Sequence, residues 1–115
     1  MSADCVFCRI VTGTVPATIV HETGSVLAFR DLNPQAPTHV LVIPKEHHPD
    51  VGSMARTAPT LAGEVLTAAD EVATIDGVRD SGYRLVFNTG RDANQTVFHV
   101  HCHMLGARTM TWPPG

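Results

Sequence analysis

Three histidines at alternate positions are the residues of this chain whose types and spacing are best suited to chemistry. His99, His101 and His103 are separated by apolar residues within the run 96–105. This alternation predicts a β-strand over residues 96–105 with one buried face. Residues two apart lie on the same face of a strand, about 6.5–7 Å from one another. Because imidazole titrates near neutral pH, three of them on one face could attack a substrate, transfer a proton or bind a metal ion.

A second group of possible ligands lies near the N-terminus, where Cys5 and Cys8 are separated by two residues. Such a pair supplies half of a tetrahedral zinc site, although two reduced cysteines on one side of a short helix would have the same spacing. Cys102 lies between the histidines on the opposite face of the predicted strand, so we expect a small core residue there. An odd number of cysteines argues against a disulfide framework and favours a cytoplasmic location.

Length and charge exclude several classes of protein. The chain has 115 residues and a net charge of −3, and Lys45 is its only lysine. A chain of this length predicts a single domain over residues 1–115. Without a basic stripe, binding to a long nucleic acid is disfavoured. No apolar stretch approaches the ~18 residues of a membrane span, and the first residues lack the pattern of a signal peptide, so we expect no membrane contact.

The elements that must position these residues can be outlined from the hydrophobic pattern. A short helix is expected from Asp4 through Thr12, and a longer amphipathic helix over residues 61–73, with a stop at Gly77. Residues 45–56 are expected to be irregular. Strands are expected over residues 19–21, 26–29, 39–43, 83–87 and 96–105. This order predicts an α+β fold with a five-stranded antiparallel sheet, one short N-terminal helix and one longer helix.

Three motifs together resemble the histidine triad superfamily. They are the His-x-His-x-His pattern followed by two apolar residues, the segment Phe29–Lys45, and the ending Trp112-Pro113-Pro114-Gly115. The ending is similar to that of the histidine triad nucleotide-binding branch, and the resemblance covers nearly the whole chain. It implies a HIT-like fold that pairs into a homodimer with one continuous sheet, with Trp112 near the partner's site. It also implies the activity of a purine nucleoside phosphoramidase.

The resemblance implies a catalytic role for each histidine of the motif. His101 would attack the α-phosphorus of a nucleoside phosphoramidate or acyl-adenylate and form a covalent nucleotidyl-histidine, which water hydrolyses to release AMP or GMP. His103 would contact the phosphate as a protonated imidazole, and His39 would support the nucleophile. The Thr96 hydroxyl would donate to the phosphate or to the leaving nitrogen. The implied catalytic set is therefore His39, Thr96, His99, His101 and His103.

The same resemblance implies a binding site for the nucleotide. Asp31 would accept hydrogen bonds from both ribose hydroxyls, because a carboxylate can receive two side by side. Asn88 would bind on the phosphate side of the site. Apolar residues would enclose the purine, although each could equally be plain core; they are Phe7, Ile10, Val15, Phe29 and Leu32.

Zinc-bearing branches of the family complete the cysteine pair with two histidines, here His47 and His99. Four protein ligands leave no open position, so the implied ion is a structural zinc, and no organic cofactor is expected. Three other functions remain open. A dinucleoside polyphosphate hydrolase would share the fold, a nucleotide-binding interaction module would need no nucleophile, and a metallohydrolase would use the three histidines of the motif as ligands.

Overall fold

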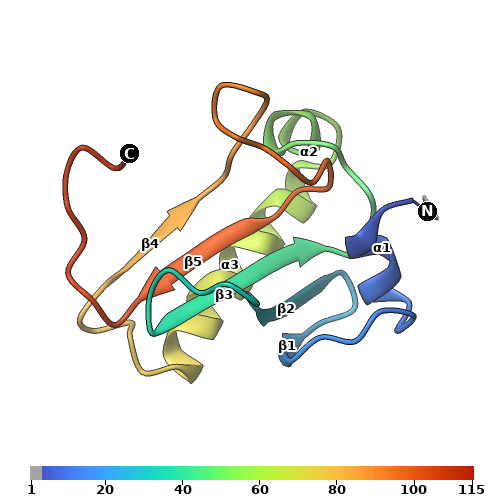
Figure 1. Ribbon diagram of the computed structural model, residues 1–115. Helices are drawn as coiled ribbons and strands as arrows, with labels where there is room; N and C mark the ends of the chain where they lie inside the picture. Colours follow the sequence, from blue (N-terminus) through green and yellow to red (C-terminus); the bar gives the residue numbers. More distant parts are fainter. Residues whose placement is uncertain (1–3) are drawn as a thin grey trace.

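The computed structural model describes residues 4–115 of the chain. Its elements, in chain order, are α1 (Val6–Val11), β1 (Ile19–Glu22), β2 (Val26–Arg30), β3 (Thr38–Pro44), α2 (Val51–Thr57), α3 (Pro59–Ile75), β4 (Tyr83–Val86) and β5 (Cys102–Gly106). The strands form one antiparallel sheet in the order β1-β2-β3-β5-β4, with α3 across one face (Figure 1). The α+β class and the five-stranded antiparallel sheet are therefore confirmed.

The central strand of the sheet is β3. It is buried along its whole length and pairs with β2 on one side and β5 on the other. The loop that joins β2 to β3 contains Pro34 and Pro37, which cannot continue a regular ladder. Where the two strands meet this loop, the backbone N–H of Asp31 donates to the carbonyl of His39 at 3.0 Å. This bond closes the end of the hairpin and brings two predicted site residues together.

Alternation along the strands separates two apolar layers. One face of the sheet packs against a stripe of small residues on α3, which are Val65, Ala68, Ala69, Val72 and Ala73. The other face packs against α1 and includes Leu41 of β3 and Phe7 of the helix. Burying both faces is possible because the strands alternate apolar side chains above and below the sheet. Cys102 lies in the α3 layer as expected, and burial raises the pKa of its thiol to about 12.

The predicted histidine strand is shorter than expected. Only residues 102–106 pair with neighbours, and the chain from 96 to 101 is irregular, with the N–H of Val100 bonded to the carbonyl of His48 at 2.8 Å. The physical reason lies in the neighbouring strand. β3 ends at Pro44, which has no N–H to donate, so the ladder cannot extend along the preceding residues. The alternation of side chains nevertheless continues past the end of the strand.

Residues 51–57, expected to be irregular, form the helix α2. The carboxylate of Asp50 caps it by accepting the N–H of Ser53 at 2.9 Å, and an aspartate before a helix stabilises its first turn even where the apolar pattern is weak. The first helix is capped by Cys5 rather than by Asp4, because the sulfur of Cys5 accepts the N–H of Cys8. Among the described residues, no helix combines the length and apolar character needed to cross a membrane.

Candidate functional site

His101 is held in one orientation by its own segment of chain. Its Nδ1 lies 2.8 Å from the carbonyl oxygen of His99, and the side chain is buried. A carbonyl can only accept, so Nδ1 carries the proton and Nε2 keeps a free lone pair. The rings of Phe7 and His103 stand edge-on to it, at centroid distances of 5.1 and 5.0 Å. A neutral imidazole fixed in this tautomer can act as a nucleophile at Nε2.

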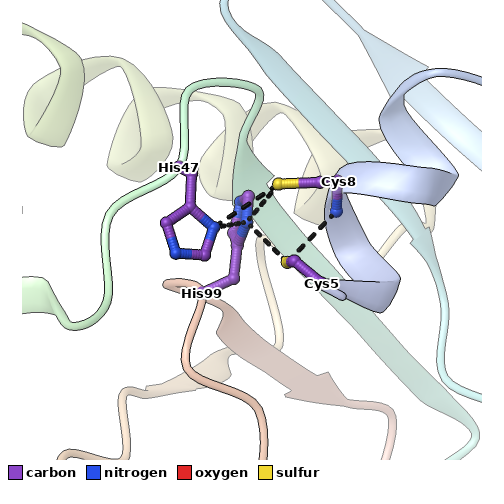
Figure 2. A group of neighbouring side chains, drawn as sticks. All are labelled: Cys5, Cys8, His47 and His99. Carbon is purple, nitrogen blue, oxygen red and sulfur yellow. Dashed lines mark hydrogen bonds between the residues drawn. The ribbon is translucent and has the colours of Figure 1, made fainter. Parts of the chain in front are cut away.

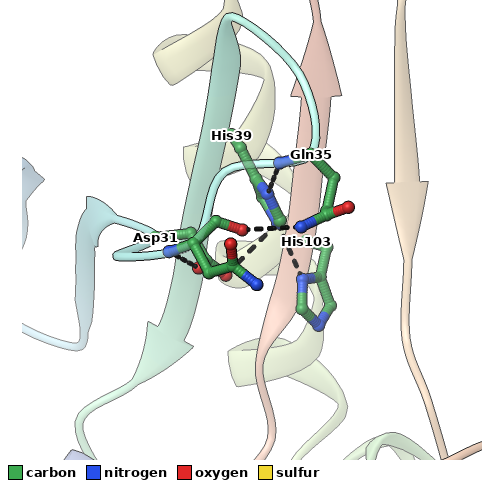
Figure 3. A network of polar contacts seen from close by, with 5 residues as sticks. Asp31, Gln35, His39 and His103 are labelled. Atoms are coloured by element: carbon green, nitrogen blue, oxygen red, sulfur yellow. Dashed lines mark hydrogen bonds and ion pairs between the residues drawn. The ribbon is translucent and has the colours of Figure 1, made fainter.

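His103 belongs to a polar chain that begins on the loop between β2 and β3 (Figure 3). The backbone N–H of Gln35 donates to Nδ1 of His39 at 3.0 Å, so a neutral His39 carries its proton on Nε2. That nitrogen lies 2.9 Å from Nδ1 of His103 and 3.4 Å from the carboxylate of Asp31. His103 therefore accepts at Nδ1 and presents an N–H at Nε2, where it can donate to an oxygen of a ligand.

Burial keeps these imidazoles neutral. It lowers the pKa of His103 to about 4, and the neighbouring imidazoles of His101 and His39 act in the same direction. Burial also lowers the pKa of His39, against the opposing charge of Asp31. This differs from the expectation that His103 is protonated. At neutral pH the free protein instead presents a neutral hydrogen-bond donor, because the low-dielectric surroundings disfavour a charged ring.

Most of the apolar residues predicted to enclose a purine lie in one cluster beside the histidines. Phe7, Ile10 and Phe29 are buried there, and Val15 packs against them. The rings of Phe7 and Phe29 meet edge to face with centroids 5.6 Å apart. Leu32 is different, since its side chain is 100% exposed. The proline-containing loop directs it into solvent, so it is not part of this cluster.

The two cysteines of α1 meet two histidines from distant parts of the chain (Figure 2). One ligand atom from each of Cys5, Cys8, His47 and His99 lies within 4.8 Å of the others. Nδ1 of His99 is 3.3 and 3.6 Å from the two sulfurs and 3.2 Å from Nδ1 of His47, which is itself 3.4 Å from the sulfur of Cys8. Ligands of a tetrahedral zinc ion stand about 3.3–3.8 Å apart, given its bond lengths. These side chains fit that ion.

The tautomer of His99 also fits a metal ion bound by these four side chains. Its Nε2 donates to the carbonyl of Pro44 at 2.8 Å, so the lone pair on Nδ1 faces the sulfurs. Burial lowers the pKa of this imidazole to about 4, which keeps it in the neutral form that binds metals. With its ligand atom turned to the thiols, His99 does not converge with His101 and His103 on a single ion. This geometry disfavours the metallohydrolase interpretation.

Asp31, His39 and His103 are also close enough to hold an ion. The N–H of Gln35 already occupies Nδ1 of His39, so the other nitrogen of that ring carries its proton. A metal at this nitrogen would have to displace the proton or break the bond to Gln35. The donor chemistry therefore favours the cysteine-containing group as the metal site.

The structure leaves three predicted site residues at a distance from these contacts. Thr96 is exposed and lines a hollow of about 390 Å³ together with Cys5, His47 and Phe98. Asn88 is half-buried just beyond the end of β4. Trp112 is 82% exposed on the C-terminal tail, beyond β4 in Figure 1. Within residues 4–115, none of the three forms a hydrogen bond with His39, His101 or His103, whose partners lie elsewhere.

Sequence reasoning missed the groups that hold the histidines in place. Two are backbone atoms, the N–H of Gln35 and the carbonyl of Pro44, and a sequence gives no direct signal for either. The third is the buried side chain of Gln95. Its amide nitrogen donates to the carbonyls of Pro49 and Val97 at 2.7 and 3.1 Å, while its oxygen accepts the N–H of Gly90. It fixes the irregular segment that leads to the histidines.

Comparison with known proteins agrees with this geometry. A family model described as the HIT domain matches residues 12–110. The 14 kDa zinc-binding protein of Zea mays is 45% identical over 113 residues, which cover 96% of this chain and 87% of that protein. A HIT family hydrolase from Legionella pneumophila superposes with a TM-score of 0.93 and 46% identity, over 97% of this chain and 100% of that one. A histidine triad nucleotide-binding protein from Candida albicans gives a TM-score of 0.82 and 28% identity, over 96% of this chain and 83% of that one.

Proposed function

Since this chain belongs to the HIT domain family, we propose that it is a purine nucleoside phosphoramidase that acts through a covalent intermediate on His101. The observation that carries this proposal is the hydrogen bond from Nδ1 of His101 to the carbonyl of His99, which leaves Nε2 free to attack. The similar hydrolase of known structure and the similar nucleotide-binding protein support the reaction class and the ligand class. A pure binding module would not need a nucleophile held in this tautomer.

The proposed reaction has two displacements at the α-phosphorus. Nε2 of His101 forms a bond to phosphorus as the phosphorus–nitrogen bond of the phosphoramidate breaks, and the departing amine takes up a proton from solvent, which the water consumed in the second step returns. Nε2 of His103 is the N–H donor in reach of the phosphate, and it stabilises the charge that develops on the phosphoryl oxygens. Water then attacks the nucleotidyl-histidine, so that AMP or GMP leaves with His101 restored. An acyl-adenylate would react by the same steps, with a carboxylate as the leaving group.

Recognition of the nucleotide is proposed to depend on Asp31 and on the neighbouring apolar cluster. One oxygen of Asp31 accepts the N–H of Asn33 at 2.8 Å, which orients the carboxylate within the loop. Each carboxylate oxygen can accept more than one hydrogen bond, so the ribose hydroxyls can still be bound. The aromatic side chains of Phe7 and Phe29 offer the apolar surface that a purine would pack against.

The four side chains that fit a zinc ion are proposed to hold it as a structural ion. Cys5, Cys8, His47 and His99 would occupy all four positions, and the bound ion would fix α1 onto the segment before β5. The similar zinc-binding protein of maize supports this proposal. The expected homodimer and the expected cytoplasmic location stay predictions.

Comparative kinetics test the proposed activity. The specificity constant for an adenosine phosphoramidate should exceed that for diadenosine triphosphate, and His101→Ala should abolish both. His21→Ala is the matched control, because it removes an imidazole on β1 that contacts Glu71 of α3 rather than the other histidines. Faster turnover of diadenosine triphosphate would favour the polyphosphate hydrolase. Failure of the wild-type protein to cleave either compound would refute the proposal.

A further inference from the structure

A largely buried carboxylate on the opposite side of the sheet joins the two strand ends that lead to predicted site residues. Asp76 follows the last residue of α3, and only 10% of its side chain is exposed. Both of its oxygens accept hydrogen bonds from the guanidinium of Arg30, and the distance from Nη2 to Oδ1 is 2.8 Å. The hydroxyl of Thr38 also stabilises its ionised form. The hydrogen bond from Arg30 is the main cause of the lowered pKa of Asp76.

Without partners, an ionised carboxylate at this position would be unfavourable in free energy. A negative charge at the C-terminal end of a helix faces the negative end of the helix dipole, and burial removes it from water. A carboxylate there is stable only while its partners stay in place. Arg30 and Thr38 are therefore held firmly to the end of α3.

The two partners are the immediate chain neighbours of the residues at the site. Arg30 is the last residue of β2 and precedes Asp31, and Thr38 is the first residue of β3 and precedes His39. Because successive side chains of a strand point to opposite faces, anchoring one residue fixes the direction of the next. On the site face, Oδ2 of Asp31 lies 3.4 Å from Nε2 of His39, and their backbones are bonded at 3.0 Å.

We propose that Asp76 is a positioning residue for ribose recognition, acting through Arg30 and Thr38 on Asp31 and His39. The inference rests on the proposed function, in which Asp31 binds the ribose hydroxyls. Its consequence is specific: a change at Asp76 should weaken the preference for ribose over 2′-deoxyribose, whereas general loosening of the fold should slow both substrates alike.

The same helix provides a matched control. Asp70 of α3 also accepts from a hydroxyl and a guanidinium, those of Tyr83 at 2.7 Å and Arg79 at 3.0 Å. It anchors β4, through Tyr83, and the turn before β4, through Arg79, instead of β2 and β3. Asp70→Asn therefore removes a carboxylate with the same kinds of partner from α3, although a more exposed one, without touching the strand ends at the site.

The experiment compares wild-type protein, Asp76→Asn and Asp70→Asn on an adenosine phosphoramidate and on its 2′-deoxy analogue. For each protein, kcat/KM is measured with both compounds, together with the melting temperature. In Asp76→Asn the ratio of the two specificity constants should fall by about tenfold, since small misplacements at a site cost rate heavily. In Asp70→Asn the ratio should stay at the wild-type value, whatever the loss of stability.

Two further variants keep the test decisive if Asp76→Asn does not fold. Thr38→Val removes only the hydroxyl and should lower the ribose preference, whereas Thr38→Ser should restore it. A preference within twofold of wild type in Asp76→Asn, or in Thr38→Val when Asp76→Asn is unfolded, would overturn the positioning role. Wild-type protein that does not cleave these compounds would instead refute the proposed function, and the inference with it.

Discussion

At the scale of single residues, His99 takes part in two sites at once. Its imidazole faces the two cysteines and His47, while its carbonyl oxygen accepts a hydrogen bond from the Nδ1–H of His101. The bond from its Nε2 to Pro44 fixes the side chain from a third direction. The orientation of the proposed nucleophile therefore depends on a residue that is itself held by its neighbours, which is how outer partners tune reactive groups.

A substitution at Asp31 tests the proposed ribose contact. Asp31→Asn should weaken binding of AMP more than binding of 2′-deoxy-AMP, because an amide offers one acceptor oxygen where the carboxylate offers two. Isothermal calorimetry with both nucleotides measures the difference. An equal loss of affinity for the two would assign Asp31 to the loop structure, through its bond to Asn33.

The lowered pKa of His103 makes a prediction about stability and pH. In the unfolded chain this imidazole titrates near 6.5, and in the folded protein near 4. Below pH 6.5 the unfolded state binds more protons, so this group's contribution is complete above that pH and is lost as the pH falls towards 4. His103→Asn should therefore show a shallower fall in melting temperature across this range, by circular dichroism. His21→Asn is the control and should keep the wild-type slope of melting temperature against pH. The same slope in His103→Asn as in wild type would contradict the neutral state of His103.

At the scale of elements, α1 depends on the ligands at its first turn. The helix has only six residues and is capped by the Cys5 sulfur, so an isolated helix of this length would not be stable. Its attachment comes from the apolar cluster around Phe7 and from the group of two cysteines and two histidines. Bound zinc would add to the folding free energy through this contact.

Replacing both cysteines tests the proposed ion. Protein purified without a metal column should contain about one zinc per chain, since the four ligands form one tetrahedral site. The double variant Cys5→Ser, Cys8→Ser should lose it, melt at a lower temperature and keep kcat within about an order of magnitude, because His101 retains its neighbours. Elemental analysis, calorimetry and kinetics measure the three effects.

Two results would contradict this account of the metal. Wild-type protein that contains no zinc and is as stable as the double variant would reject the site. A stable but inactive double variant would show that the ion organises His101 through His99, beyond a structural role.

The elements show which parts of the architecture a sequence can predict. The strands β2 and β3 and the long helix follow from local apolar patterns, which are strong for residues 26–29, 39–43 and 61–73. The length of β5 does not follow from its own apolar pattern, because Pro44 on another strand sets where the pairing ends. Likewise, the motif singled out the histidines, but their tautomers depend on the distant backbone of Gln35 and Pro44. Such partners are determined by tertiary contacts and leave no local signal.

At the scale of the whole molecule, the C-terminal tail lies outside the sheet core and is joined to β4 by the hydrogen bond from Arg84 to the carbonyl of Thr111 at 3.1 Å. Residues 111–115 are exposed. The edge strand on this side of the sheet is β4. Edge strands commonly pair with another chain, and the expected homodimer would cover such an edge. Trp112, at 82% exposure, is then available to lie beside the partner's site, as the family resemblance implies.

Removal of residues 112–115 tests the role of the tail. Folding and the expected dimer should survive, because an extended segment with two prolines cannot belong to a central strand. The specificity constants for bulky and small leaving groups should change by different factors, while the affinity for AMP stays nearly constant. Kinetics, calorimetry and sedimentation provide the three readouts. A uniform loss across substrates, or loss of the dimer, would show that the tail is scaffold.

The central claim is that His101 becomes covalently attached to the nucleotide, and intact-protein mass spectrometry tests it most directly. Wild-type protein is mixed rapidly with an adenosine phosphoramidate and quenched at alkaline pH, where a phosphorus–nitrogen bond to histidine survives. We predict a transient increase of one adenylyl group, mapped to His101, present in His21→Ala and absent from His101→Ala. Turnover by wild-type protein without such an adduct, or an adduct that persists in His101→Ala, would contradict the account.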